Sequence, residues 1–214
     1  AGAAGMGGAG QGGQGGSGGG TTPCHPPGLV DAFNGPAVDT SLWVEWSDPD
    51  FTIGISSGVL VIAPPAPAVT YGYGNVTSQN SYDLRGCAMW VEVVAIADPS
   101  QNGETYFSAT VDNDNKASFA IWEDGLYFTL DVGAVTTDTA HVTYSPTQHR
   151  WWRLREAGGT ISWETSPDGH SWNNRLQAVS PAFMDHVKLR LSAGVKAAAT
   201  SPGEAQFDNV NLEP

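Results

Sequence analysis

Hydrophobic and polar residues alternate along much of the chain after residue 30. Within residues 89–93 and 126–132, every second residue is aliphatic or aromatic and its neighbours are polar or mixed. Within residues 187–191 the polar positions are basic. Because successive side chains of a β-strand point to opposite faces of its sheet, this period of two predicts strands with one buried face.

Strand-like segments follow one another to the end of the chain, separated by turn residues such as Gly158-Gly159. We expect strands at residues 51–56, 59–63, 88–97, 105–112, 117–123, 126–132, 141–144, 150–157, 160–166, 187–195 and 205–212. No segment longer than about eight residues keeps a helical period. So many strands do not fit one flat sheet. The sequence therefore predicts an all-β fold, an antiparallel two-sheet β-sandwich.

The first 20 residues differ from the rest, because glycine recurs there with a period of three. In an extended threefold helix this spacing leaves two bare edges and one polar edge. Bare edges let backbones approach and hydrogen-bond laterally, which predicts self-association through an extended assembly arm. The residues of this arm are Gly7, Gly10, Gln11, Gly13, Gln14, Gly16, Ser17 and Gly19. The alternative is a flexible tether, since Gly-rich tracts are usually random coils.

A Pro-containing neck, residues 21–28, links the arm of residues 1–20 to a single expected domain, residues 29–214. The two cysteines are Cys24 in the neck and Cys87 in the domain. In an exported protein such a pair predicts a disulfide, and two unpaired thiols are the alternative. No Cys-x-x-Cys or His-x-x-x-His spacing accompanies them to indicate a metal site.

The charge balance narrows the range of partners. Acidic residues outnumber basic ones by 22 to 9, which gives a net charge of −13. Nucleic acids and anionic membranes require Lys/Arg patches, so neither is an expected partner. No apolar run of about 18 residues is present to span a membrane. We expect a secreted protein, extracellular or at the cell surface, whose signal peptide has been removed.

Several segments resemble bacterial concanavalin A-like, laminin-G-type jelly-roll modules. They are residues 31–35 with 42–43, 151–155, 163–169 with Trp172, and 207–210. The resemblance extends from about Leu29 to Leu212 and implies a jelly-roll sandwich. It implies no single activity, because this fold carries glycosidases, lectins and structural modules.

The arrangement of acidic residues along the predicted strands argues against catalysis. Glucanases of this fold carry Glu-x-Asp-x-Glu on one strand, which puts the carboxylates needed for glycoside hydrolysis on one face. Glu92 and Glu164 each stand alone in their predicted strands. Glu45, Asp48 and Asp50 cluster where a solvated turn is expected. The five histidines accompany no serine elbow motif. The sequence predicts a non-catalytic domain.

Two kinds of ligand are considered. Tyr71, Tyr73 and Asn75 lie on a Gly-containing segment whose composition is typical of a glycan-binding loop, although a loop packed on a sheet edge has the same composition. Asp112 and Asp114 offer oxygen ligands for calcium, but Asx-rich hairpin turns are common for backbone reasons alone. No other cofactor is expected.

Two functions follow from these patterns. The first is a structural subunit of an extracellular filament or surface assembly, a homopolymer joined through the Gly-rich arm. The alternative is a surface-tethered, lectin-like module that binds polysaccharide through its aromatic residues.

Overall fold

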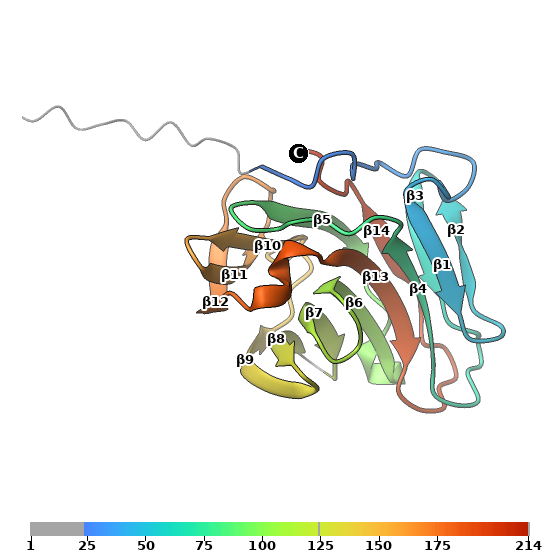
Figure 1. Ribbon diagram of the computed structural model, residues 1–214. Helices are drawn as coiled ribbons and strands as arrows, with labels where there is room; N and C mark the ends of the chain where they lie inside the picture. Colours follow the sequence, from blue (N-terminus) through green and yellow to red (C-terminus); the bar gives the residue numbers. More distant parts are fainter. Residues whose placement is uncertain (1–23, 124, 214) are drawn as a thin grey trace, which may run out of the picture.

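The computed structural model describes residues 24–123 and 125–213 (Figure 1). They form two antiparallel sheets, as predicted, and each sheet has seven strands. One, here called the β6 sheet, has the order β1 (Trp43–Ser47), β4 (Gly72–Ser78), β13 (Lys188–Val195), β6 (Gly103–Thr110), β7 (Lys116–Trp122), β8 (Gly125–Val132), β9 (Val135–Thr143). The other, the β5 sheet, has the order β12 (Asn173–Val179), β11 (Thr160–Ser166), β10 (Trp151–Ala157), β5 (Ala88–Ala95), β14 (Ala205–Asp208), β3 (Val59–Ala63), β2 (Thr52–Ser56).

Two short 3-10 helices, Pro99–Gln101 and Ala182–Asp185, lie in the connections. In the described part of the chain, no helix is long and apolar enough to cross a membrane.

The core lies between the two sheets and is made by alternate residues of their strands. Phe119 of the β6 sheet stacks on Trp152 of the β5 sheet with 5.3 Å between ring centroids, and on Phe107 beside it at 5.7 Å. All three side chains are fully buried. Burial of each such ring stabilises the fold by about 1.5–3 kcal/mol, so this stack ties one sheet to the other.

The disulfide expected between Cys24 and Cys87 is present, with 4.7 Å between the two Cα atoms. The two residues also form an isolated bridge outside the named strands. The Ala88 amide donates a hydrogen bond to the Cys24 carbonyl at 2.7 Å. The beginning of the described chain is therefore fastened beside β5.

Strands β1, β4 and β12 were not predicted, and β9 begins six residues before the predicted segment. In β4 the reason is glycine at the positions that face the core. A Cβ on Gly72 would lie 3.0 Å from the Phe51 ring, and one on Gly74 would lie 3.1 Å from both Phe51 and Ile62. Close packing therefore selects glycine here, and glycine hides the alternation that indicates a strand.

The adjacent residues Trp151 and Trp152 are both buried, although they lie on opposite faces of the β5 sheet. Trp152 lies in the core, and Trp151, on the opposite face of the β5 sheet, is only 4% exposed. Trp151 packs there with Ala88, Trp90 and Trp172. A second, smaller apolar cluster therefore covers part of the outer face of this sheet.

Candidate functional site

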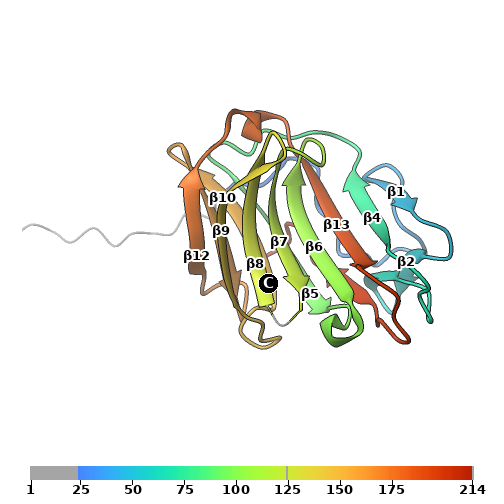
Figure 2. The same ribbon diagram turned by 90° about the horizontal axis from the view of Figure 1, so that it is seen from below.

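The outer face of the β6 sheet, the face that points away from the core, gathers most of the polar and aromatic residues of interest. Figure 2 looks onto this sheet, and none of the described elements crosses in front of it. Strand pairing places seven residues side by side in a central row, one from each strand. They are Trp46, Asn75, Ser192, Tyr106, Ala120, Tyr127 and His141. With strands about 4.8 Å apart, the row extends for about 29 Å.

Ring side chains form a continuous chain over this face. The successive members are Tyr71, Tyr73, Tyr106, Trp122, Tyr127 and His141, with centroid separations of 5.1, 6.0, 6.3, 4.4 and 5.0 Å. Tyr127 stacks between Trp122 and His141, so both of its faces are covered. Its ring edge and hydroxyl are the parts left for a ligand.

Two aromatic side chains on the same part of the sheet are far more open. Trp46 is 55% exposed and Tyr71 is 63% exposed. Trp46 stands directly opposite Asn75 in the β1–β4 pair. Trp46 also borders a groove of about 380 Å³ lined by Glu45, Trp46, Ser47, Phe51, Thr52 and Ile53. An apolar ring beside an amide is the combination that sugar rings require, because sugars present both C–H faces and hydroxyl groups.

Glu104 is the buried acid of this face. The hydroxyls of Tyr73 and Tyr106 both donate hydrogen bonds to its Oε2 atom, the second at 2.9 Å. Gly194 lies between Tyr73 and Glu104 in the strand register. Burial raises the pKa of both tyrosines, and the neighbouring carboxylate raises it further. Both phenols are therefore held as neutral donors.

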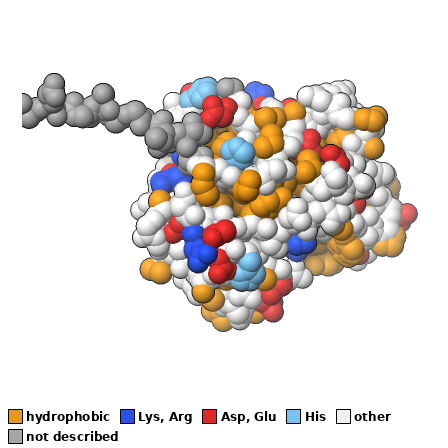
Figure 3. All heavy atoms as spheres, turned by 45° about the horizontal axis from the view of Figure 1, so that its top comes forward, with side chains coloured by type: hydrophobic (Ala, Val, Ile, Leu, Met, Phe, Trp, Pro, Cys, Tyr) orange, Lys and Arg blue, Asp and Glu red, His pale blue; other side chains and the backbone are white. Residues whose placement is uncertain are grey.

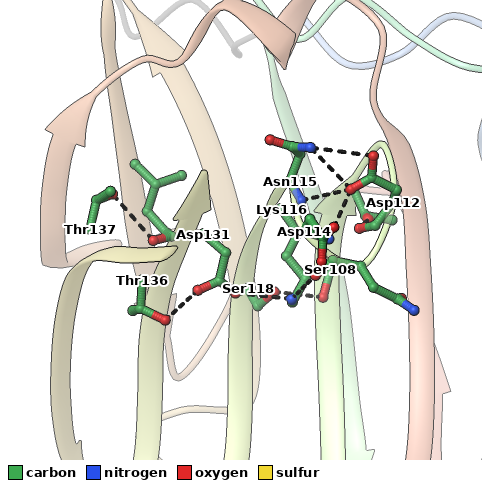
Figure 4. A network of polar contacts seen from close by, with 12 residues as sticks. Ser108, Asp112, Asp114, Asn115, Lys116, Ser118, Asp131, Thr136 and Thr137 are labelled. Carbon is green, nitrogen blue, oxygen red and sulfur yellow. Dashed lines mark hydrogen bonds and ion pairs between the residues drawn. The ribbon is translucent and has the colours of Figure 1, made fainter. Parts of the chain in front are cut away.

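A row of hydroxyls lies beside the central row, one step along the strands. Five of its seven positions carry hydroxyls, namely Thr77, Ser108, Ser118, Thr129 and Thr139, and the other two are Val44 and Arg190. The Ser108 and Ser118 hydroxyls are joined by a hydrogen bond of 2.9 Å and both residues are buried (Figure 4). Short side chains in the middle of a sheet leave room between the longer ones on either side.

The last row of this face is charged. Lys188, Thr110, Lys116, Asp131 and Thr136 are successive partners across the sheet. The Lys116 ammonium forms an ion pair with Asp131 at 3.0 Å, and Asp131 accepts a hydrogen bond from Thr136 (Figure 4). The face therefore changes from aromatic, through hydroxyl, to charged over three successive rows.

The acidic turn proposed for calcium is a β6–β7 hairpin turn closed by its own carboxylate. Oδ1 of Asp112 accepts hydrogen bonds from the backbone amides of Asp114 and Asn115, both at 2.8 Å (Figure 4). These bonds lower the pKa of Asp112. The described residues contain no group of three His, Cys, Asp or Glu side chains placed to hold a metal ion. Hydrogen bonds between the Asp112 side chain and the backbone of the turn explain why Asp and Asn occur here. Calcium binding stays a prediction.

The outer face of the β5 sheet differs, because two of its strand acids are held by arginines, while a third, Asp208, lies directly opposite Glu92. Glu92 accepts from Arg150 Nε at 2.5 Å. Glu164 accepts from Arg153 Nε at 2.6 Å and from Arg155 at 2.9 Å. Figure 3 shows hydrophobic side chains on the upper side of the molecule, with basic groups close to acidic ones. Paired charges of this kind need no ligand to be satisfied.

The structure brings the predicted glycan-binding residues together on the outer face of the β6 sheet. Tyr73 and Asn75 are on β4, and Tyr71 immediately precedes that strand, so the segment is not a loop. Sequence reasoning missed Glu104, which becomes recognisable only when the register brings β6 beside β13. Trp46 is 55% exposed, whereas Trp43, Trp152 and Trp163 are buried in the core, so burial is what distinguishes it.

Comparisons with known proteins concern the fold alone. No family model and no curated protein sequence matches the chain. Among solved structures, the Bacillus licheniformis beta-glucanase is similar with a TM-score of 0.62 and 14% identity, over 85% of this chain and 95% of that one. The legume lectin-like domain from Entamoeba histolytica gives 0.58 and 10%, over 79% and 88%. The VIP36 exoplasmic/lumenal domain, bound to Ca²⁺ and Man3GlcNAc, gives 0.57 and 12%, over 85% and 86%. The fold is therefore the concanavalin A-like jelly-roll sandwich.

The prediction of a non-catalytic domain is contradicted by these comparisons, because glycoside hydrolases are among the similar structures. That prediction rested on the absence of paired acids along single strands. Indeed, no described strand carries two acids at alternate positions. Catalytic carboxyl groups need only flank one bond in space, however, and they can come from different strands or loops. The spacing of acids along single strands therefore does not exclude catalysis.

The predicted assembly arm, residues 1–20, lies outside the described residues. Its bare glycine edges and its role in self-association stay predictions.

Proposed function

We propose that this protein binds carbohydrate, in the form of an extended polysaccharide, on the outer face of the β6 sheet. The observation that carries the proposal is the central row, seven neighbouring positions that cross the whole sheet. A linear polymer laid along this row would meet ring, amide and hydroxyl groups in turn. A small ligand would use only a fraction of the row.

The two ends of the row offer different contacts. At one end, exposed Trp46 presents ring surface for stacking on a sugar ring, as does exposed Tyr71, which lies outside the row just before β4. Tyr106, Tyr127 and His141 continue the row with polar ring edges. Specific carbohydrate recognition combines a few apolar surfaces with a few placed polar groups, and this face offers both.

The similar structures support this proposal at the level of class. One is a lectin-like domain, one is a glucanase, and one was solved with the oligosaccharide Man3GlcNAc bound. The disulfide suits an oxidising compartment, so we place the protein outside the cell or in a lumenal space.

Affinity electrophoresis against soluble glucans, mannans, xylans and acidic polysaccharides tests the proposal. We expect at least one polymer to retard the protein, and Trp46→Ala and Tyr71→Ala to weaken its binding by about fivefold each. Trp172→Ala is the matched control, since this ring lies under Arg153 on the β5 sheet. Absence of retardation by every polymer, or equal weakening by the control, would rule out this face as the binding site.

Glycoside hydrolysis on the same face is the second candidate. The favouring observation is Glu104, a buried carboxylate held by two tyrosine hydroxyls at the margin of the central row. The assay is release of reducing ends from the polymer that binds. We expect Glu104→Gln to abolish release while leaving binding within twofold of wild type. A wild-type protein that binds the polymer but releases no reducing ends would eliminate hydrolysis and leave the binding function intact.

Self-association through residues 1–20 is a separate proposal and is compatible with carbohydrate binding. Sedimentation of the full chain, the chain without residues 1–20, and Gly13→Leu tests it. We expect large assemblies only for the full chain, because a bulky side chain closes a bare edge of the arm. Identical sedimentation of all three proteins would make the arm a tether.

A further inference from the structure

Two basic residues on the outer face of the β6 sheet lack acidic partners. Lys188 and Arg190 are two residues apart on β13, so both side chains belong to this face. Six of the nine Lys and Arg residues form ion pairs within 4.0 Å: Arg85, Lys116, Arg150, Arg153, Arg155 and Lys196. Among the described residues, neither Lys188 nor Arg190 has such a pair. Acidic residues are abundant in a chain with net charge −13, so two neighbouring cations without acidic partners need an explanation.

Arg190 is the more constrained of the two. Its Nε atom is buried and has no hydrogen-bond partner among the described residues. Its Nη1 atom donates to the side-chain carbonyl of Asn113 at 3.0 Å. Its direct neighbours across the sheet are Thr77 and Ser108, whose side chains are neutral. A guanidinium carries five donors in a planar fork, so Arg190 has donors left for a further partner.

This arrangement costs stability in the free protein. Burial lowers the pKa of Arg190, and nearby Asp112 offsets the effect only in part. A buried donor without a partner loses its hydration and gains nothing in return. Destabilised polar groups of this kind are typical of binding sites. A ligand that supplies the missing hydrogen bonds offsets the loss of stability. The partner that matches a guanidinium fork is a planar or tetrahedral oxyanion.

We propose that the polysaccharide recognised by this face is anionic, with a carboxylate or sulfate ester seated on Arg190 and Lys188. This inference rests on the proposed carbohydrate-binding function and names the substrate class of the same site. The two cations stand one and two steps along the strands from the central row. With about 6.6–7 Å per two residues of strand, a charged substituent of a sugar on the central row reaches Arg190.

Three monosaccharide probes separate the sources of the negative charge. D-glucuronate carries a carboxylate, glucose 6-sulfate carries a sulfate ester, and glucose carries neither. They are titrated at constant ionic strength into the full-length protein, with amide and Arg190 Nε–H shifts followed by NMR. We expect one or both anionic probes to shift Arg190, Thr77 and Ser108, and glucose to leave them unchanged. Failure of both anionic probes at 50 mM, or equal shifts from glucose, would overturn the proposal.

Charge-neutral variants then test the two residues against a matched control. We expect Arg190→Gln to weaken binding of the effective probe by about tenfold or more, as for a charged hydrogen-bonding partner, and Lys188→Gln by about threefold. Lys196→Gln removes the same charge from the end region of β13, where Lys196 pairs with exposed Glu123, and should change binding less than twofold. Similar losses of affinity in all three variants would show that binding depends only on the net charge of the protein, and would overturn the proposed site.

Failure of this inference is distinguishable from failure of carbohydrate binding. Suppose that a neutral polysaccharide retards the wild-type protein but not Trp46→Ala, and that neither anionic probe binds. Carbohydrate binding by this face is then supported, and the proposed specificity for anionic polysaccharides is rejected. If Arg190→Gln unfolds at the same temperature as wild type, its loss of binding is not caused by a loss of folded protein.

Discussion

The Tyr73 hydroxyl donates a hydrogen bond to Oε2 of Glu104, an atom that also accepts from the Tyr106 hydroxyl at 2.9 Å. One carboxylate oxygen thus holds two phenols from neighbouring parts of the β6 sheet. Burial is the main cause of the raised pKa of both phenols. The charge on Glu104 adds to it, because ionising a phenol beside a carboxylate places like charges together.

The Tyr–Glu–Tyr contact predicts loss of stability in alkali. A phenol in the unfolded chain has a pKa of about 10, and in the folded chain the pKa of Tyr106 is higher. Above about pH 10 the unfolded state therefore releases protons that the folded state retains, and the free energy of unfolding falls as pH rises. Urea unfolding at pH 8, 9.5 and 11 measures this fall. In Tyr106→Phe the decline should be shallower, and an unchanged slope would contradict the assignment.

Gly194 is predicted to be intolerant of any side chain. A Cβ there would collide with the Tyr73 ring and lie 2.9 Å from the Gly72 carbonyl oxygen. We expect Gly194→Ala to lower the free energy of unfolding by about 1–3 kcal/mol, the usual cost of overpacking, and to weaken polysaccharide binding by displacing Tyr73. Ser192→Ala, two residues earlier on the same face, is the control and should cost less than about 1 kcal/mol. Chemical denaturation of both variants gives the comparison.

The alternation of residues was enough to predict the two-sheet sandwich, because buried strands such as β7 and β8 carry an aromatic or aliphatic residue at every core position. It failed for β4, where contact with Phe51 requires glycine at two core-facing positions. The binding face was only partly visible for a different reason. Tyr73 and Asn75 are neighbours in sequence, whereas Glu104 and Arg190 join them through β13, a pairing that no local pattern encodes.

His149 predicts a loss of stability in acid. Burial, with a contribution from Arg175, lowers the pKa of His149 to about 4, and its Nδ1 atom accepts a hydrogen bond from the Ser145 amide at 3.1 Å. An unfolded histidine titrates near 6.5, so between pH 6.5 and 4 the unfolded state takes up a proton that the folded state excludes. The free energy of unfolding should fall as pH decreases through this window. His149→Asn, which retains an acceptor but does not titrate, should flatten the decline, and guanidinium unfolding at pH 7, 5.5 and 4.5 measures it.

The disulfide predicts a large loss of stability on reduction. Cys24 and Cys87 are 63 residues apart, and closing a loop of that size contributes about 4 kcal/mol in the chain-entropy model. We expect the double variant Cys24→Ser with Cys87→Ser to lower the free energy of unfolding by about that amount. Dithiothreitol should reproduce the loss in wild type and leave the double variant unaffected. A loss below about 1 kcal/mol would show that the link constrains the unfolded chain very little.

Arg190 provides the prediction that most directly separates a binding role from a structural one. If its guanidinium supported the sandwich, removing it would destabilise the fold. Because Nε is buried without a partner, an apolar side chain of similar length should instead be tolerated or favoured. We expect Arg190→Met to unfold at the same temperature as wild type or a few degrees higher by calorimetry, while losing affinity for the anionic probe. A variant that melts several degrees lower would show that Arg190 stabilises the fold. The unpaired Nε donor would then no longer be evidence for a ligand site.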